Sequence, residues 1–246
     1  MRNDWYTDFF SGLMVDFWEK ALPAEQTQAE VKFLHDVFGL PPGRRLLDVP
    51  CGHGRHAIAL AKLGYQMTGI DLSQDCLARA RQSGGERVEW RRSDIRDLPW
   101  RAEFDGAFCC GNSFGYMDRS GMRVFAAAVS QTLKPGARFV LETGAAAESL
   151  LPALQERRWM ELGDLLFFSR GQYDCAKSRL DTTYSVVKGG VRETKTAHTW
   201  IFTVAEIREM LSTEGLETEA IYGSVAKEAY GLGSARLVLV AQKGGG

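Results

Sequence analysis

The hydrophobic pattern of the chain begins with an unusually aromatic helical stretch. Residues 4–20 place apolar side chains at helical spacing, and six of these eight side chains are aromatic: Trp5, Tyr6, Phe9, Phe10, Leu13, Met14, Phe17 and Trp18. The spacing predicts one amphipathic helix that Pro23 ends. A second helix is predicted over about 24–38, with Gly39 as its C-terminal cap.

From Arg45 onwards, short apolar runs alternate with helical stretches. The runs predict strands at 46–49, 65–70, 88–91, 104–110 and 138–142, and the intervening patterns predict helices at 55–63, 74–82 and 122–133. Strands that are joined by crossover helices form a mostly parallel sheet with helices on both faces. The middle of the chain therefore predicts an α/β core.

The pattern of apolar and polar residues changes again after residue 145. A helix is predicted over about 146–157, followed by three runs rich in strand formers at 165–173, 179–187 and 191–202. The turn at 188–190 favours a hairpin between the last two runs, so this segment predicts a small antiparallel sheet. A helix over 203–214 and strands over 217–223 and 236–241 complete the chain.

Four regions follow from these changes of pattern. We expect an N-terminal helical segment over 1–40, an α/β core over 41–145, a helix with an antiparallel sheet over 146–202, and completion of the core over 203–246.

The amino-acid composition argues against nucleic acid and anionic membranes as binding partners. Thirty basic residues face 31 acidic ones, which gives no overall attraction to nucleic acid or to an anionic membrane. The basic stretch 87–101 is interrupted by acids and is interpreted as a solvated surface. The five cysteines form no Cys-x-x-Cys motif, which argues against a disulfide framework and a zinc cluster and favours a cytoplasmic location. No stretch is apolar and long enough to span a bilayer.

The stretch LLDVPCGHGRHA at 46–57 combines an apolar run, an acid and a glycine-rich turn before a helix. Such a turn lets a nucleotide approach the helix N-terminus. Gly52-x-Gly54-x-x-Ala57 fits the dinucleotide fingerprint, and Asp71 lies 19 residues beyond Gly52, where an acid that binds ribose belongs. Asp48 lies at the end of the first predicted strand, just ahead of the glycine-rich turn. It argues against a bound pyrophosphate, because a carboxylate that points into the binding site at this turn repels phosphate and attracts a cationic head group. The alternative is that Asp48 only bonds loop amides.

At these motifs the sequence resembles the class I S-adenosylmethionine-dependent methyltransferases. The first family motif corresponds to Asp48–Gly54, with Pro50 in place of the first glycine. The segments GIDLS (69–73), RRSDI (91–95), the strand ending at Cys110-Gly111, and LKPGARFVLET (133–143) follow in the family's order. The resemblance implies a doubly wound seven-stranded sheet, mostly parallel with an antiparallel last strand, in a Rossmann-like fold.

The resemblance also implies S-adenosylmethionine as the cofactor. Asp71 is then expected to bind the ribose hydroxyls, Asp94 the adenine amino group, and Ile95 the adenine ring, while backbone carbonyls near Cys110 hold the methionine end. The full set of expected cofactor-binding residues is Asp48, Pro50, Gly52, Gly54, Asp71, Leu72, Asp94, Ile95, Cys110 and Gly111.

The resemblance further implies that the segment 41–145 binds the cofactor, that the helical segment 1–40 is a lid, and that the inserted sheet within 146–202 covers the substrate. Substrate contacts are therefore expected from the N-terminal helix, the loop after the fourth strand and the inserted sheet. These candidates are Tyr6, Asn112, Ser113, Tyr116 and His198. His198 is also the candidate catalytic base, because an imidazole titrates near neutrality; its structural interpretation is an ordinary cross-strand residue. His53 and His56 lack the further ligands that a metal site needs, so no metal is expected.

These observations predict a methyltransferase that acts on the nitrogen or oxygen of a small-molecule metabolite, with neither nucleic acid nor membrane as a partner. The sulfonium methyl is already activated, so positioning is the main task of the protein. The alternatives are an NAD(P)-dependent oxidoreductase and a protein that binds S-adenosylmethionine without catalysis.

Overall fold

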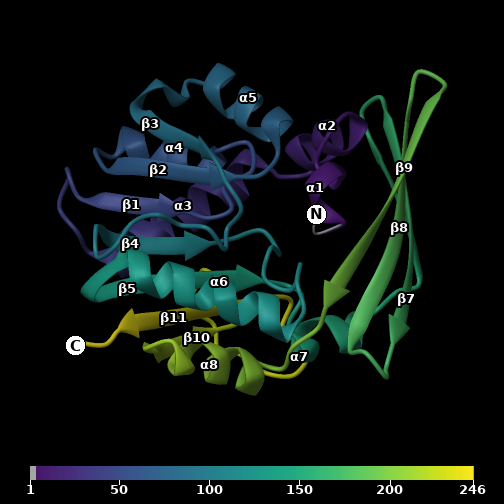
Figure 1. Ribbon diagram of the computed structural model, residues 1–246. Coiled ribbons are helices and arrows are strands. Elements are labelled where there is room, and N and C mark those ends of the chain that lie inside the picture. Colours follow the sequence, from purple (N-terminus) through teal and green to yellow (C-terminus); the bar gives the residue numbers. More distant parts are fainter. Residues whose placement is uncertain (1–3, 246) are drawn as a thin grey trace.

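A seven-stranded sheet forms the body of the computed structural model, which describes residues 4–245 (Figure 1). Its order is β10-β11-β5-β4-β1-β2-β3. The strands are β1 (Arg45–Asp48), β2 (Gln66–Asp71), β3 (Val88–Arg92), β4 (Phe104–Cys109), β5 (Leu133–Thr143), β10 (Leu216–Tyr222) and β11 (Leu237–Lys243). β11 is antiparallel to both of its neighbours, whereas β1 to β5 pair in parallel. The predicted fold class is confirmed.

Helices cover both faces of this sheet (Figure 1). They are α3 (Ala24–Phe38), α4 (Arg55–Lys62), α5 (Gln74–Gln82), α6 (Arg119–Thr132) and α8 (Val204–Thr213), with a short 3-10 turn η1 (Gly85–Arg87) before β3. The sheet has a hydrophobic core on each face, and alternate residues of β5 point into one or the other. Phe139 belongs to the core that contains Phe125 of α6, and Val140 belongs to the core that contains Leu34 of α3. No helix of the described residues could cross a membrane.

The second sheet has four antiparallel strands, in the order β6-β7-β8-β9. These are β6 (Arg157–Leu162), β7 (Leu165–Asp174), β8 (Arg179–Lys188) and β9 (Val191–Trp200). The predicted helix over 146–157 is wrong. Only α7 (Ala147–Leu150) and the 3-10 turn η2 (Leu151–Ala153) form there, since Pro152 cannot continue a helix. β6 is then a fourth strand, joined to β7 by a tight turn at Gly163.

The single helix predicted over residues 4–20 is also wrong, because the segment forms two helices. α1 (Tyr6–Phe9) and α2 (Leu13–Lys20) are separated at Gly12, whose φ of 58° is outside the helical range. The carboxylate of Glu193 in β9 accepts a hydrogen bond from the Leu13 amide at 2.8 Å. The inserted sheet therefore supplies an acceptor at the start of α2.

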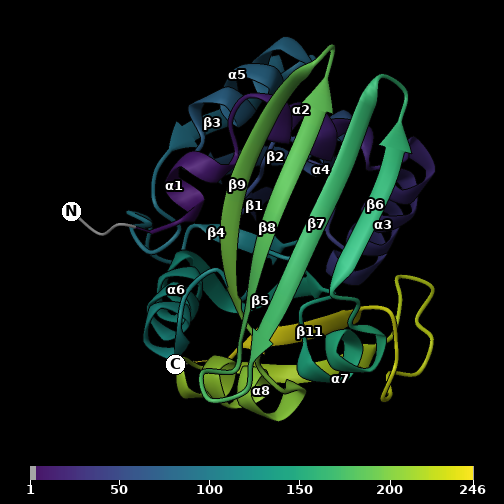
Figure 2. The same ribbon diagram turned by 90° about the vertical axis from the view of Figure 1, so that its right-hand side faces the viewer.

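The apolar face of α2 and Phe9 of α1 pack against the second sheet, whereas Tyr6 of α1 contacts the body core. Phe9, Met14 and Phe17 form one buried cluster with residues of β7, β8 and β9: Leu165, Phe167, Val186 and Ala197. Figures 1 and 2 show these two helices between the body and the second sheet. In contrast, α3 belongs to the body core, so the predicted lid over 1–40 narrows to α1 and α2, and its closing role stays a prediction; residues 1–3 lie outside the described residues.

We predict that Phe17→Ala destabilises the protein by about 3 kcal/mol. Phe17 is fully buried and stacks on Phe167 at a centroid distance of 4.0 Å, so truncation leaves a cavity between α2 and the sheet. Denaturant unfolding followed by circular dichroism measures the change. Leu63→Ala, at an exposed position, is the matched control. Equal unfolding midpoints for the two variants would contradict this account of the packing.

Candidate functional site

The glycine-rich loop after β1 is held to the end of β2 by backbone hydrogen bonds. The Cys51 amide donates to the Ile70 carbonyl at 2.8 Å, and the Gly52 amide donates to the carboxylate of Asp71 at 2.8 Å. Gly54 has a φ of 81°, and a Cβ there would come within 2.3 Å of the Trp90 ring. The loop therefore needs glycine at position 54 to close against β3.

Asp71 lies at the carboxyl end of β2 with both oxygens engaged. Besides the Gly52 amide, it accepts a hydrogen bond from the Ser73 amide at 2.8 Å. Burial raises the pKa of the Asp71 carboxyl, and the two amides oppose that rise. Each carboxylate oxygen has a second lone pair, so Asp71 keeps the capacity to accept hydrogen bonds from neighbouring hydroxyl groups. Pro50 and Leu72 flank this point and are half-buried.

Asp48 is a buried acid that lacks hydrogen-bond partners. It is 1% exposed, and neither carboxylate oxygen has a hydrogen-bond partner among the described residues. Burial raises its pKa well above the ordinary value, and the charge of Asp71 adds to the rise. The charge of Arg55 opposes it, as does a weak polar contact with the Ala57 backbone that falls short of hydrogen-bond geometry. Unpaired buried carboxylates are costly. The arrangement suits a cationic ligand group that would complete the pairing.

The loop after β3 is connected to the N-terminal segment through Arg96. Its guanidinium Nη2 lies 2.5 Å from Asp94 and 2.7 Å from Asp4. The side chain of Arg96 is only 8% exposed, so the interpretation of 87–101 as a solvated surface is wrong at this position. Ile95 is buried beside it. The predicted adenine-binding residues are thus fixed to the start of the lid.

The end of β4 is held to β5 and β11 by polar contacts. The Gly111 amide donates to Glu142 at 3.0 Å, and Glu142 also pairs with Arg236. The amide oxygen of Asn112 accepts from the Gly144 amide at 2.5 Å. Burial raises the pKa of the Cys110 thiol. The structure therefore places the Asn112 side chain against the end of β5, and Asn112 does not line the cavity described below.

An aromatic cluster joins α1 to the loop after β4. Tyr116 stacks with Tyr6 and with Phe10 at centroid distances of 5.9 Å each, and the Trp5 indole donates to the Tyr116 carbonyl at 3.2 Å. Ser113, which is buried, bonds the Tyr116 side chain. The structure thus brings three of the predicted substrate residues together, at the point where the lid meets the body.

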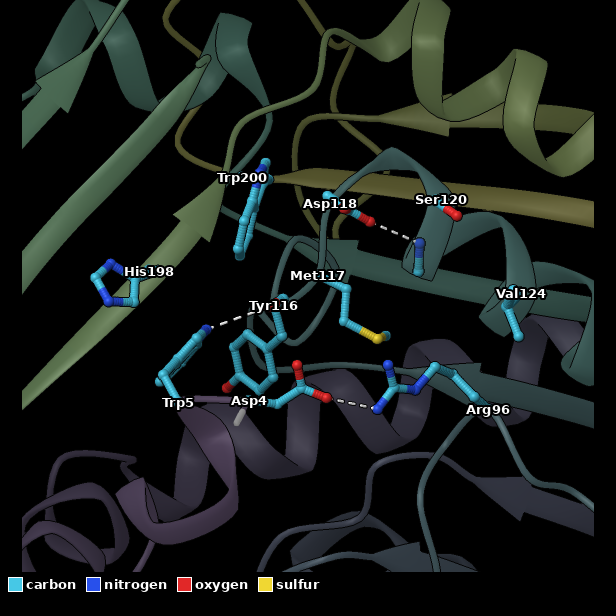
Figure 3. A pocket seen from close by; sticks show the side chains of 11 residues that line it. Asp4, Trp5, Arg96, Tyr116, Met117, Asp118, Ser120, Val124, His198 and Trp200 are labelled. Carbon is cyan, nitrogen blue, oxygen red and sulfur yellow. Dashed lines mark hydrogen bonds and ion pairs between the residues drawn. The ribbon is translucent and has the colours of Figure 1, made fainter. Parts of the chain in front are cut away.

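A cavity of about 340 Å³ opens beside this cluster (Figure 3). It lies between the lid, the start of α6 and the end of β9. Its walls are Asp4, Trp5, Arg96, Tyr116, Met117, Asp118, Ser120, Gly121, Val124, His198 and Trp200. The lining combines three aromatic rings with two acids, one arginine and one histidine. This composition suits a polar small molecule with a ring or an amino group.

His198 reaches this cavity from β9 and is paired with Asp181. The Nδ1 atom of His198 lies 2.6 Å from Asp181, its cross-strand neighbour on β8. Arg179 also contacts Asp181 and lowers the pKa of that carboxyl, with a smaller contribution from His198. A carboxylate that accepts the Nδ1 proton leaves Nε2 as the basic nitrogen. The pair therefore has the composition of an oriented general base.

Two other histidines, His35 and His56, have structural contacts. His56 is buried and bonds Glu30 at 2.7 Å, and Glu30 also pairs with Arg55 at 2.5 Å. His35 bonds the Tyr65 hydroxyl at 2.8 Å. Within residues 4–245, no group of three His, Cys, Asp or Glu side chains is arranged to hold a metal ion.

Sequence reasoning missed several residues that line or support the site: Asp4, Trp5, Arg96, Trp200 and Asp181. Trp5 belonged to the aromatic pattern and could have been proposed with Tyr6. Asp181 gave no local signal, because its role depends on the register between β8 and β9.

Comparison with known proteins gives a family match for part of the chain. Residues 46–136 match the family model of the methyltransferase domain. The chain is 28% identical over 207 residues to the cypemycin N-terminal methyltransferase of a Streptomyces species, which covers 82% of this chain and 84% of that protein. The chain spans about two fifths of the length of the first curated relatives it matches, which are 30% and 34% identical to it.

Solved structures show the same fold over the whole chain. The CcbJ methyltransferase of Streptomyces caelestis superposes with a TM-score of 0.80 at 19% identity, covering all of both chains. CalS10 of Micromonospora echinaspora, an amino pentose methyltransferase solved with S-adenosylmethionine bound, gives a TM-score of 0.70 at 20% identity over 96% of this chain and 98% of that one.

We predict that Asp48→Asn stabilises the ligand-free protein at neutral pH, by a few degrees in melting temperature. The folded-state pKa of Asp48 lies above its unfolded value of about 3.9, so the wild type loses stability as pH rises from that value through the folded pKa. Melting temperatures of both proteins measured from about pH 4 to pH 8 should diverge with rising pH. A constant difference across this range would contradict the assignment.

Proposed function

We propose that the chain is a class I S-adenosylmethionine-dependent methyltransferase that methylates a nitrogen or oxygen atom of a small-molecule metabolite. The observation that carries this proposal is the buried, unpartnered Asp48 behind the glycine loop. A carboxylate at that position opposes a dinucleotide pyrophosphate and favours the cationic ammonium of a methionine moiety.

Each of the residues at the strand ends would bind a different part of the cofactor. Asp71 would accept hydrogen bonds from the ribose hydroxyls, and Asp48 would pair with the amino group of the methionine moiety. Asp94 and Ile95 would hold the adenine, while Gly52 and Gly54 leave room for close approach of the backbone. S-adenosylmethionine, when bound, supplies an activated methyl group.

The cavity beside Tyr116 is the proposed acceptor site. Tyr116, Trp5 and Trp200 would shape its walls, with Tyr6 stacked on Tyr116 and Ser113 bonded to the Tyr116 side chain. The acids Asp4 and Asp118 favour an acceptor that carries an amino group, as the names of the cypemycin and CalS10 enzymes also suggest. His198 would remove the proton that an amine or hydroxyl loses on methylation, with Nε2 facing the acceptor.

The N-terminal helices are proposed as a lid over both sites. The Asp4–Arg96–Asp94 ion pairs connect the lid to the adenine-binding loop, and the Ser73 hydroxyl donates to the Phe10 carbonyl at 2.5 Å beside the ribose-binding acid. Closure of such a lid excludes water from the transfer site. We further propose a cytoplasmic location, in keeping with five free thiols, and a substrate other than nucleic acid.

We predict that Asp71→Ala weakens binding of S-adenosylhomocysteine at least tenfold, because the variant removes the acceptor of the ribose hydroxyls. Calorimetric titration measures the affinity. Asp174→Ala is the matched control, since Asp174 bonds only within its own turn at Lys177 and Ala176. The same titration with NADH should show no binding to the wild type. Tight NADH binding, or equal affinity of both variants for S-adenosylhomocysteine, would reject the proposed cofactor site.

We predict that His198→Ala lowers kcat for methyl transfer by about a hundredfold and leaves the affinity for S-adenosylhomocysteine unchanged. A coupled assay of S-adenosylhomocysteine release, run on a panel of small amines and hydroxyl compounds, first identifies an acceptor. His198→Gln serves as the isosteric comparison. If both variants turn over that acceptor at the wild-type rate, His198 has only a structural role.

A further inference from the structure

The outer strand of the second sheet presents an open edge. β6 is the last strand in the order of that sheet, and Figure 2 shows it outermost. Residues 157–161 are exposed, and none of the hydrogen bonds of the described residues joins its free edge to another element. Unpaired strand edges are templates for another strand, and proteins normally protect them. This edge therefore has the geometry of a pairing surface.

An apolar patch continues from that edge across the outer face of the sheet. Trp159 is 71% exposed and lies opposite Phe168 of β7, which is 45% exposed; Leu166 lies next to them on the same face. The inner face is different, because Phe167 is buried against α2. Contiguous exposed apolar side chains mark interaction surfaces.

β6 carries a positive charge two residues before Trp159 and a negative charge two residues after it. Arg157 and Glu161 share the outer face with Trp159, since side chains alternate along a strand. Neither forms an ion pair or a side-chain hydrogen bond with any described residue. When two copies of β6 pair antiparallel about a twofold axis at Trp159, Arg157 faces Glu161 of the partner subunit, and this pair occurs twice. Trp159 then faces its own copy, and Arg158 faces Met160 of the partner subunit.

We propose that β6 pairs with β6 of a second copy of this chain, giving a twofold dimer with one continuous eight-stranded sheet. Three independent features support this arrangement: the unpaired edge, the apolar patch beside it and the self-complementary charges. The proposal concerns assembly and does not depend on the methyltransferase activity.

Sedimentation equilibrium on the full chain tests the proposal. The wild type should show twice the 27.3 kDa mass of one chain at micromolar concentration. Arg157→Glu places like charges opposite each other in both symmetric pairs, and so does Glu161→Arg. Each variant should raise the dimer dissociation constant at least tenfold.

The two variants also test the register. An equimolar mixture of Arg157→Glu and Glu161→Arg chains should dimerise with near wild-type affinity, because the opposite charges then face each other across the interface. The Arg157→Glu/Glu161→Arg double variant should likewise recover self-association. No recovery in either experiment would overturn the proposed pairing register.

Trp159→Lys tests the centre of the interface, and Val191→Lys is the matched control. Val191 is 64% exposed and lies on β9, the opposite edge strand of the same sheet. We expect monomers for Trp159→Lys and dimers for Val191→Lys, with circular dichroism spectra equal to the wild type. A monomeric wild type, or a Trp159→Lys variant that remains dimeric, would refute the proposal.

Discussion

The hydrogen bond from the Gly52 amide to Asp71 joins the ends of β1 and β2, and the rest of the site depends on it. At 2.8 Å it fixes the glycine loop at the edge of the sheet where parallel strands all end. Asp48 ends β1, Asp71 ends β2 and Asp94 follows β3. Because these three strands are neighbours in the sheet, the acids lie at the same edge. Burial raises the pKa of both Asp48 and Asp71, because both carboxyl groups are removed from water at this edge of the sheet.

Much of this could be predicted from the sequence because the signals are local. Each strand of the body is a short apolar run, and the acids that end β1 and β2 stand next to the residues that position them. Gly54 is similarly local, since its backbone conformation and the nearby Trp90 ring exclude a side chain. The order of these motifs along the chain, through the family resemblance, is enough to predict both the fold and the cofactor.

Features that depend on distant residues could not be predicted. The break at Gly12 places the Leu13 amide on Glu193, which is 180 residues away. β6 lacks the alternation of a half-buried strand because both of its faces are exposed, and only its register with β7 defines it. The pairing of His198 with Asp181 likewise required the register of β8 and β9, and Arg96 could not be linked to Asp4 without the path of the lid.

The central claim is that the strand ends form a site for S-adenosylmethionine, with each acid bonded to a particular part of it. A crystal structure of the protein with S-adenosylhomocysteine tests this most directly. The account predicts the ribose hydroxyls on Asp71, the adenine amino group beside Asp94, and the ammonium group facing Asp48, directly or through one water. A ligand bound elsewhere, or a carboxylate of Asp48 that stays unpartnered in the complex, would contradict it.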